Sequence, residues 1–311
     1  MIKVLHTADI HLDVPFKIAN VAKAQTRRSE LRGALSSLFT YARLEHFDLM
    51  LIAGDMFDRE FVTPDTVALV LREMAACSDC RIIIAPGNHD PYTPGSVWAK
   101  TEFPSNVYIF CSSELEKLSL DDIGVDVYGY AFTAPYMDSC PFSEPPSLDP
   151  SRINILCGHG CLGGSSRHCP ITAEDISCSG FDYIALGHIH NSDGIKRTGR
   201  TWYGYPGALE GHDFGEPGFG GAIVATMQKV GGVFDCDARG RRFSRRRFET
   251  LTVDTSTVRS DTDLLALIDG EIAAHGYGEE TQLRLVLTGF LSSAVALSES
   301  AILDHISPSL F

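Results

Sequence analysis

Short hydrophobic runs alternate with segments of helical spacing along most of the chain. Residues 2–6, 48–53 and 82–85 are apolar almost throughout, as expected of strands that are buried on both faces. Residues 23–45 carry leucines at helical spacing, and Thr63 before a proline is typical of a helix start. This alternation predicts an α/β fold.

Further strands are expected in the middle of the chain at 107–110, 125–130, 153–157, 183–186, 201–205 and 222–227. The pattern then changes, and the expected elements are strands at 233–237 and 243–253 around a glycine-containing turn, a helix at 261–274 and a strand at 282–288. We therefore place a domain boundary near residue 255.

The chain length of 311 residues is typical of two domains. The boundary gives a catalytic domain at 1–255 and a smaller domain at 256–311. No hydrophobic run approaches the roughly 20 residues that a membrane-spanning helix needs. The chain opens directly into a strand-like segment without the pattern of a signal peptide, so we expect a cytoplasmic protein.

The charge is acidic, with 40 Asp and Glu against 26 Lys and Arg, a net charge of −14. This argues against a protein that holds nucleic acid through bulk positive charge. It leaves room for a nuclease whose bound metals and local arginines contact the phosphates. Six arginines between 239 and 247 form a basic run. It could follow a DNA backbone, or it could be the solvated face of a hairpin.

Polar side chains of the types that bind metals follow five of the expected strands. The clusters lie at 7–11, 54–58, 87–90, 158–160 and 187–190. In open α/β sheets, ligands bind beyond the carboxyl ends of the strands. Glycines stand beside the polar residues in four of the clusters and allow the backbone to turn tightly. The clusters therefore predict one site at the strand ends.

Seven residues form the candidate ligand set, which is Asp9, His11, Asp55, Asn88, His159, His188 and His190. Imidazole with carboxylate suits manganese, iron or zinc. Seven ligands exceed what one ion takes, and suit two ions that share a carboxylate. Two divalent ions would also make the site net positive and attractive to a phosphate ester. Apart from His89, the remaining histidines are interpreted as structural, and these are His6, His46, His168, His212, His275 and His305.

The order of these clusters, written D-x-H, GDxxD, GNHD, GHG and GHxH, resembles the calcineurin-like metallophosphoesterase superfamily. Three segments, 6–16, 181–190 and 205–216, are similar to DNA-repair exonucleases of the SbcD/YhaO type. The resemblance implies a four-layer α/β/β/α sandwich. It also implies a small C-terminal α+β cap, which looks truncated beside the longer members of the group.

The resemblance also implies roles for the ligand set. Asp9, His11 and His190 would hold one ion, and a second triad of Asn88, His159 and His188 would hold the other. Asp55 would bridge the two ions, which are usually manganese in the nuclease group, with iron or zinc as alternatives.

Three further residues are implied in catalysis. His89 would be the proton donor to the leaving oxygen, and Asp58 would orient it. Arg59 stands where phosphatases of the superfamily place a phosphate-binding arginine. Many nucleases of the group carry histidine at the position of Asp58. This departure leaves both DNA and another ester open as the substrate.

The leading hypothesis is a two-metal phosphodiester hydrolase, a DNA exo- or endonuclease of the SbcD/YhaO type. The alternative enzyme is a phosphodiesterase or phosphatase for a small or non-nucleic ester. A third hypothesis is a non-catalytic scaffold, which the intact ligand set disfavours. DNA is then the expected substrate, and the resemblance implies an SbcC-like coiled-coil ATPase and a second copy of the chain as candidate partners, with no membrane contact.

Overall fold

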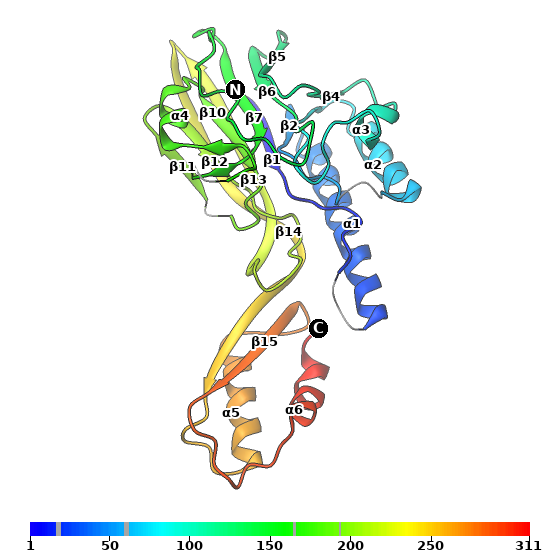
Figure 1. The fold of residues 1–311 in the computed structure, drawn as a ribbon, viewed down its shortest axis with the longest axis vertical. Helices are drawn as coiled ribbons and strands as arrows, with labels where there is room; N and C mark the ends of the chain where they lie inside the picture. The colour runs from blue at the N-terminus through cyan, green and yellow to red at the C-terminus, as the bar shows by residue number, and fades with distance from the viewer. Residues whose placement is uncertain (17–19, 59–61, 164–165, 193) are drawn as a thin grey trace. The chain divides into compact units, whose positions relative to one another are not determined.

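A computed structural model describes residues 1–16, 20–58, 62–163, 166–192 and 194–311 (Figure 1). The chain divides into two compact units. The first unit consists of residues 1–210 and 220–244, and the second of residues 211–219 and 245–311. The functional boundary expected at residue 255 stays a prediction.

One sheet of the first unit has the strand order β14-β13-β1-β2-β3-β4. Its strands are β1 (Ile2–Thr7), β2 (Leu49–Ile52), β3 (Arg81–Ile84), β4 (Val107–Ile109), β13 (Gly218–Val230) and β14 (Val233–Asp254). Strands β1 to β4 run parallel, and β13 is antiparallel to β1. The carboxyl ends of the parallel strands therefore meet at one edge.

The other sheet has the order β11-β12-β10-β7-β6-β5. Its strands are β5 (Glu116–Leu120), β6 (Val125–Gly129), β7 (Ile153–His159), β10 (Tyr183–Gly187), β11 (Ile195–Thr198) and β12 (Thr201–Gly204). Strands β6, β7, β10 and β12 run parallel. A small pair, β8 (Cys161–Leu162) and β9 (Pro170–Ile171), follows β7.

The described part of the first unit contains four helices, namely α1 (Val21–Leu44), α2 (Pro64–Ala76), α3 (Val97–Lys100) and α4 (Ala173–Cys178). The hydroxyl of Thr63 caps α2 as expected. Helix α1 also buries a charge, because Arg27 pairs with Glu210 at 2.7 Å and both side chains are fully buried.

Alternating residues of the strands divide the first unit into layers. On one face of the first sheet, Leu5 and Met50 pack with Leu35 of α1. On its other face, Val4 and Leu51 share a core with the second sheet. The outer face of the second sheet packs in a third core with residues of α4. These cores make the α/β/β/α sandwich, as expected from the sequence.

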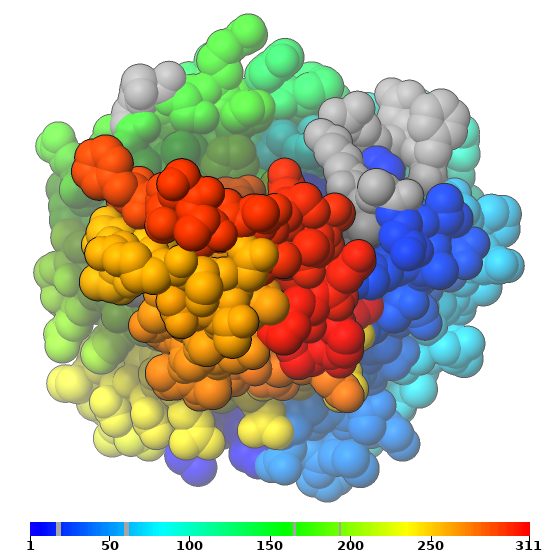
Figure 2. Space-filling model, turned by 90° about the horizontal axis from the view of Figure 1, so that it is seen from below, coloured from blue at the N-terminus to red at the C-terminus, as the bar shows by residue number. Residues whose placement is uncertain are grey.

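The second unit has its own hydrophobic core. Its elements are the C-terminal part of β14, α5 (Asp261–Ala274), β15 (Thr281–Thr288), α6 (Glu299–Ile306) and a 3₁₀ turn at Ser307–Ser309. Strand β15 pairs in parallel with β14. Helices α5 and α6 lie side by side (Figure 2), and Leu264, Ile268 and Ile302 are buried with Val253 of β14.

The turn expected between 237 and 243 is wrong, because β14 runs without a break from Val233 to Asp254. Gly240 is a residue within this strand. The turn lies earlier, at Gly231 and Gly232, whose φ angles of 58° and 81° need glycine. The sequence pattern also missed β5, β8, β9, β11 and helices α3, α4 and α6, which are all short.

Within the residues that the structure describes, no helix combines the length and apolar character needed to span a membrane.

Candidate metal centre

The seven candidate ligands come from both sheets of the sandwich. Strands β1, β2 and β3 are followed by Asp9 and His11, by Asp55 and by Asn88, respectively. His159 ends β7, while His188 and His190 follow β10. In the structure, ligand atoms of Asp9, His11 and His190 lie within 4.8 Å of one another, as do those of Asp9, Asp55 and His159. The structure thus brings the predicted set together.

Asp55 lies at the middle of this set. Its Oδ2 atom is 3.3 Å from Nε2 of His159 and 3.6 Å from Nε2 of His11. On the side of Asp55 where His11 lies, Nε2 of His11 is 3.2 Å from Nε2 of His190. On the side where His159 lies, Oδ1 of Asn88 is 2.9 Å from Nε2 of His159. One carboxylate therefore separates two groups of donor atoms.

The second group is completed by His188, whose Nδ1 atom is 3.1 Å from Oδ1 of Asn88. Backbone contacts orient two of these residues. Nδ1 of His159 lies 2.9 Å from the carbonyl oxygen of Ala53, which can only accept, so Nδ1 donates and Nε2 is the ring nitrogen that faces Asn88 and Asp55. The N–H of His188 donates to both carboxylate oxygens of Asp9.

The backbone is strained at four of the seven positions. Asp9, His11 and Asp55 have φ angles of 49°, 49° and 51°, and His188 has 103°. Non-glycine residues avoid this left-handed region, and such strain clusters at functional sites. The glycines also matter, since a Cβ on Gly87 would collide with the carboxylate of Asp55. The fold therefore tolerates local strain where it holds these side chains together.

Burial and mutual charge set the protonation of the centre in the absence of ions. Burial disfavours the charged form of His159, but the carboxylates of Asp55 and Asp9 outweigh it and raise its pKa to about 9. Burial also opposes the charge of Asp55, but neighbouring imidazoles, above all His159, hold its pKa far below the usual range. Burial lowers the pKa of His188 to about 3.

The donor set fits divalent cations. It places four imidazoles, two carboxylates and one amide oxygen in a buried to half-buried space, with donor atoms 2.9 to 3.8 Å apart. Mixed nitrogen and oxygen donors suit manganese, iron and zinc. The arrangement on both sides of Asp55 suits two ions that share its carboxylate.

His89 and Asp58 form a pair beside the ligand set. Nδ1 of His89 is 3.1 Å from Oδ1 of Asp58, which also lies 3.5 Å from Nδ1 of His11. The hydrogen bond to Asp58 raises the pKa of His89, although partial burial opposes this. Imidazole Nε2 of His89 is thereby available to hold and release a proton. Arg59, the third expected catalytic residue, lies outside the described residues.

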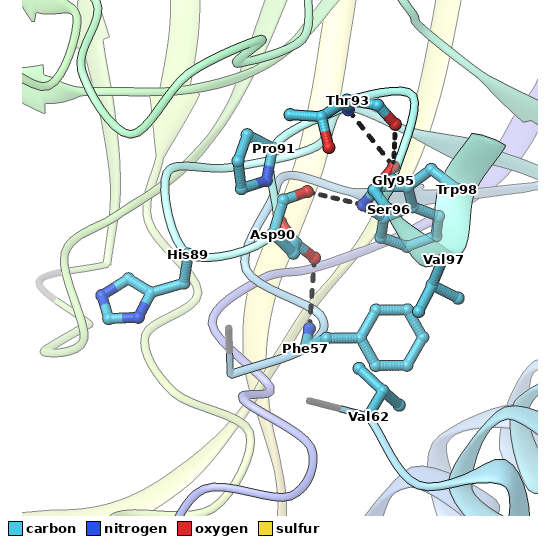
Figure 3. A pocket seen from close by; sticks show the side chains of 10 residues that line it. All are labelled: Phe57, Val62, His89, Asp90, Pro91, Thr93, Gly95, Ser96, Val97 and Trp98. Atoms are coloured by element: carbon cyan, nitrogen blue, oxygen red, sulfur yellow. Dashed lines mark hydrogen bonds between the residues drawn. The ribbon is translucent and has the colours of Figure 1, made fainter. Parts of the chain in front are cut away.

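A pocket of about 350 Å³ lies behind His89. Its lining includes Phe57, Val97 and Trp98, and His89 also lines it. Figure 3 shows the imidazole of His89 pointing away from the other side chains of the pocket. The pocket is therefore separate from the side of His89 that faces the candidate ligands.

Asp90 is a structural residue of the site that the sequence pattern did not single out. Its buried carboxylate accepts backbone N–H bonds from Met56, Phe57, Asp55 and Gly87 at 2.7 to 3.2 Å. These bonds tie the loop after β2 to the loop after β3. Its place in the segment Gly-Asn-His-Asp was the only signal available.

Two histidines outside the ligand set, both interpreted as structural from the sequence, lie in different surroundings. His6 is buried in the core, where its Nδ1 atom is 3.0 Å from the Tyr183 hydroxyl and its Nε2 atom is 3.1 Å from the Leu186 carbonyl. The structural interpretation of His6 is confirmed. His168 instead packs against the candidate ligand His188, with 5.1 Å between ring centroids. Its purely structural interpretation misses this contact.

Comparisons with known proteins agree with this site. The family of calcineurin-like phosphoesterases matches residues 2–192. The uncharacterized metallophosphoesterase YhaO of Bacillus subtilis is 29% identical over 92% of this chain and 71% of its own length. The SbcD component of the nuclease SbcCD is 25% identical in Staphylococcus epidermidis, over 69% of this chain and 63% of its own length. The SbcD component from Bacillus subtilis is 26% identical over 74% of this chain and 67% of its own length.

This chain thus spans about two thirds of the length of those relatives. The matched region, residues 2–192, includes every candidate ligand and the His89–Asp58 pair. The chain belongs to the calcineurin-like phosphoesterase family and is a metal-dependent phosphoesterase of the two-metal type.

Proposed function

We propose that this protein hydrolyses phosphodiester bonds of DNA, as a nuclease of the SbcD/YhaO type. The observation that carries the proposal is the pairing of His89 with Asp58 at 3.1 Å beside the seven-residue donor set. A proton donor next to a cation site is what cleavage of an unactivated phosphate ester requires.

In this proposal, the ligand set divides into two triads around Asp55. Asp9, His11 and His190 hold one ion, and the triad of Asn88, His159 and His188 holds the other. When bound, two divalent ions activate water at neutral pH and stabilise the charge that develops on the phosphate oxygens. We propose manganese as the native metal.

His89 supplies the proton that the leaving oxygen needs. The hydrogen bond from Nδ1 to Asp58 orients the imidazole and favours its charged form, so that Nε2 carries a transferable proton. General acid catalysis of this kind contributes about 10²–10⁴-fold to the rate. Arg59 is proposed to contact a non-bridging oxygen of the phosphate.

The nuclease assignment is supported by two relatives that are named as parts of the SbcCD nuclease. The net charge of −14 favours the second candidate, a small or non-nucleic phosphoester, because duplex DNA is normally held by positive charge. Both candidates use the same ions and the same proton donor.

The partners follow from the nuclease proposal. We propose that the chain acts in the cytoplasm, that it associates with an SbcC-like coiled-coil ATPase, and that two copies assemble. Residues 256–311 would serve as part of a cap that positions DNA. Light scattering of the purified chain, alone and with such an ATPase, tests both associations.

The first experiment measures hydrolysis of bis-p-nitrophenyl phosphate, labelled single-stranded DNA and labelled duplex DNA, each with Mn²⁺ and with EDTA. Mn²⁺-dependent cleavage of the small ester and of DNA, lost in Asp55→Asn, supports the nuclease. Cleavage of the small ester alone supports the second candidate. If no phosphodiester is cleaved with any of Mn²⁺, Fe²⁺ or Zn²⁺, the proposed function is wrong.

A further inference from the structure

An aromatic stack begins at the candidate ligand His188 and reaches the protein surface. The ring of His168 lies 5.1 Å from that of His188. His168 also stacks with Tyr136, with 5.4 Å between centroids and 29° between planes. The guanidinium of Arg167 lies 4.3 Å from the centroid of the Tyr136 ring. Three consecutive contacts thus connect the metal centre with Arg167.

The backbone fixes the stack in place. Residues 136–138 and 167–169 lie side by side through a bridge between Met137 and His168. Met137 donates its N–H to the carbonyl of Arg167 at 3.0 Å and accepts the N–H of Cys169 at 2.7 Å. The side chains of the stack therefore project from two segments that are hydrogen-bonded to each other. Because the backbone is already fixed, less entropy is lost when a ligand binds.

The outer end of the stack is open to solvent. Tyr136 is 53% exposed. The side chain of Arg167 is 65% exposed, and its ion pair with Asp138 is equally exposed. Such a surface pair contributes little to stability. The guanidinium of Arg167 is therefore accessible from solvent.

We propose that Tyr136, Arg167 and His168 form a platform that stacks an unpaired base of the substrate at the outer end of this row of contacts, which begins at the metal centre. Aromatic rings and guanidinium planes hold bases of single-stranded nucleic acid in this way. A base within a duplex has both faces covered by its neighbours and cannot use the platform. The inference rests on the proposed function and specifies its substrate as a single strand or a frayed end.

The acidic composition of the chain also favours binding through base stacking. A net charge of −14 works against affinity that comes from bulk neutralisation of many phosphates. Stacking supplies affinity without net charge, and removal of one stacking side chain typically costs about 1–3 kcal/mol per base, or roughly 5- to 150-fold in affinity.

The test compares two labelled 12-nucleotide strands by fluorescence anisotropy in EDTA, so that no hydrolysis occurs. One is oligothymidylate, and the other is an abasic strand with the same phosphates. We expect the thymidylate to bind more tightly. Tyr136→Ala should remove that preference, and Tyr136→Phe should keep it. Leu44→Ala, which shortens a side chain of α1 that is 64% exposed and lies outside the proposed cap, is the control and should also keep it.

Equal binding of the two strands by the unmodified protein would overturn the platform, as would a preference that survives Tyr136→Ala. These outcomes are separate from failure of the proposed function, which is measured by Mn²⁺-dependent hydrolysis of bis-p-nitrophenyl phosphate. If the protein hydrolyses the ester but binds both strands equally, the proposed function stands and the platform is refuted. If it prefers thymidylate but hydrolyses neither the ester nor DNA, the platform stands as a binding surface and its role in substrate binding is refuted.

Discussion

The carboxylate of Asp90 accepts the backbone N–H of Met56 at 2.8 Å, across the gap between the loops that follow β2 and β3. The same side chain accepts three more N–H groups, from Asp55, Phe57 and Gly87. One buried carboxylate thus fixes the loop that carries Asp55 against the loop that carries Asn88.

Replacement of Asp90 by asparagine should therefore damage both the fold and the site. One oxygen becomes an amide donor that faces backbone donors, and each buried N–H left without an acceptor costs about 1–3 kcal/mol. We expect the free energy of unfolding in urea to fall by about 2–4 kcal/mol. Asp304→Asn, at an exposed position on α6, is the control and should change it by less than about 0.5 kcal/mol. Equal stability of the two variants would contradict the role of Asp90.

Asp55→Asn tests the shared position of this carboxylate between the two triads. Asparagine keeps Oδ1, which accepts the backbone N–H of His89 at 2.8 Å, so the loop contact survives. It places an uncharged amide where Oδ2 meets His11 and His159. We expect metal affinity to fall by more than the roughly 10–100-fold seen for residues that only orient ligands.

Metal content after dialysis, measured by mass spectrometry of the ions, checks this expectation, again with Asp304→Asn as the control. A variant of Asp55 that keeps two ions per chain would show that the carboxylate does not bridge them.

His89→Ala tests the proton donor. Because His89 is outside the ligand set, the variant should keep its metal and lose about 10²–10⁴-fold in kcat on DNA. The loss should be much smaller on p-nitrophenyl esters, whose leaving oxygen needs no proton. Asp58→Asn should show the same dependence on the leaving group with a smaller loss, since it removes the partner of the imidazole and leaves the imidazole in place. Equal losses on both kinds of ester would assign His89 another role.

The location of the centre could be predicted because each ligand cluster directly follows a hydrophobic strand. Parallel strands end at one edge, and the local sequence fixes which residues stand there. That β7 and β10 belong to a second sheet facing β1 to β3 came only from the resemblance, since the pairing of distant strands leaves no local pattern.

Other features depend on contacts between residues far apart in the chain. His168 looks like any isolated histidine in the sequence, and only the fold places it against His188. The acceptor role of Asp90 depends on the backbone of a different loop. The continuous strand β14 was missed because Gly240 looks like a turn residue, whereas Gly231 and Gly232 take the left-handed angles that the hairpin requires.

His6 provides a prediction for the dependence of stability on pH. Burial lowers the pKa of His6 to about 3 in the folded protein, although the Leu186 carbonyl opposes this, while the usual value for the unfolded chain is 6.5. Between these values, the unfolded chain binds a proton that the folded chain excludes. Acidification therefore favours unfolding, by about 1.4 kcal/mol for each pH unit well below 6.5, until the folded pKa is reached.

His6→Gln removes this ionisable group, while a glutamine side chain can still donate to the Leu186 carbonyl and accept from the Tyr183 hydroxyl. We expect the variant to be less stable than the unmodified protein at pH 7.5, and the difference to shrink steadily between pH 6.5 and pH 4.5. Urea unfolding across this range measures it, with the exposed His275→Gln as the control for replacing a histidine. A constant difference at every pH would show that His6 is protonated equally in both states, and would refute burial as the cause of its low pKa.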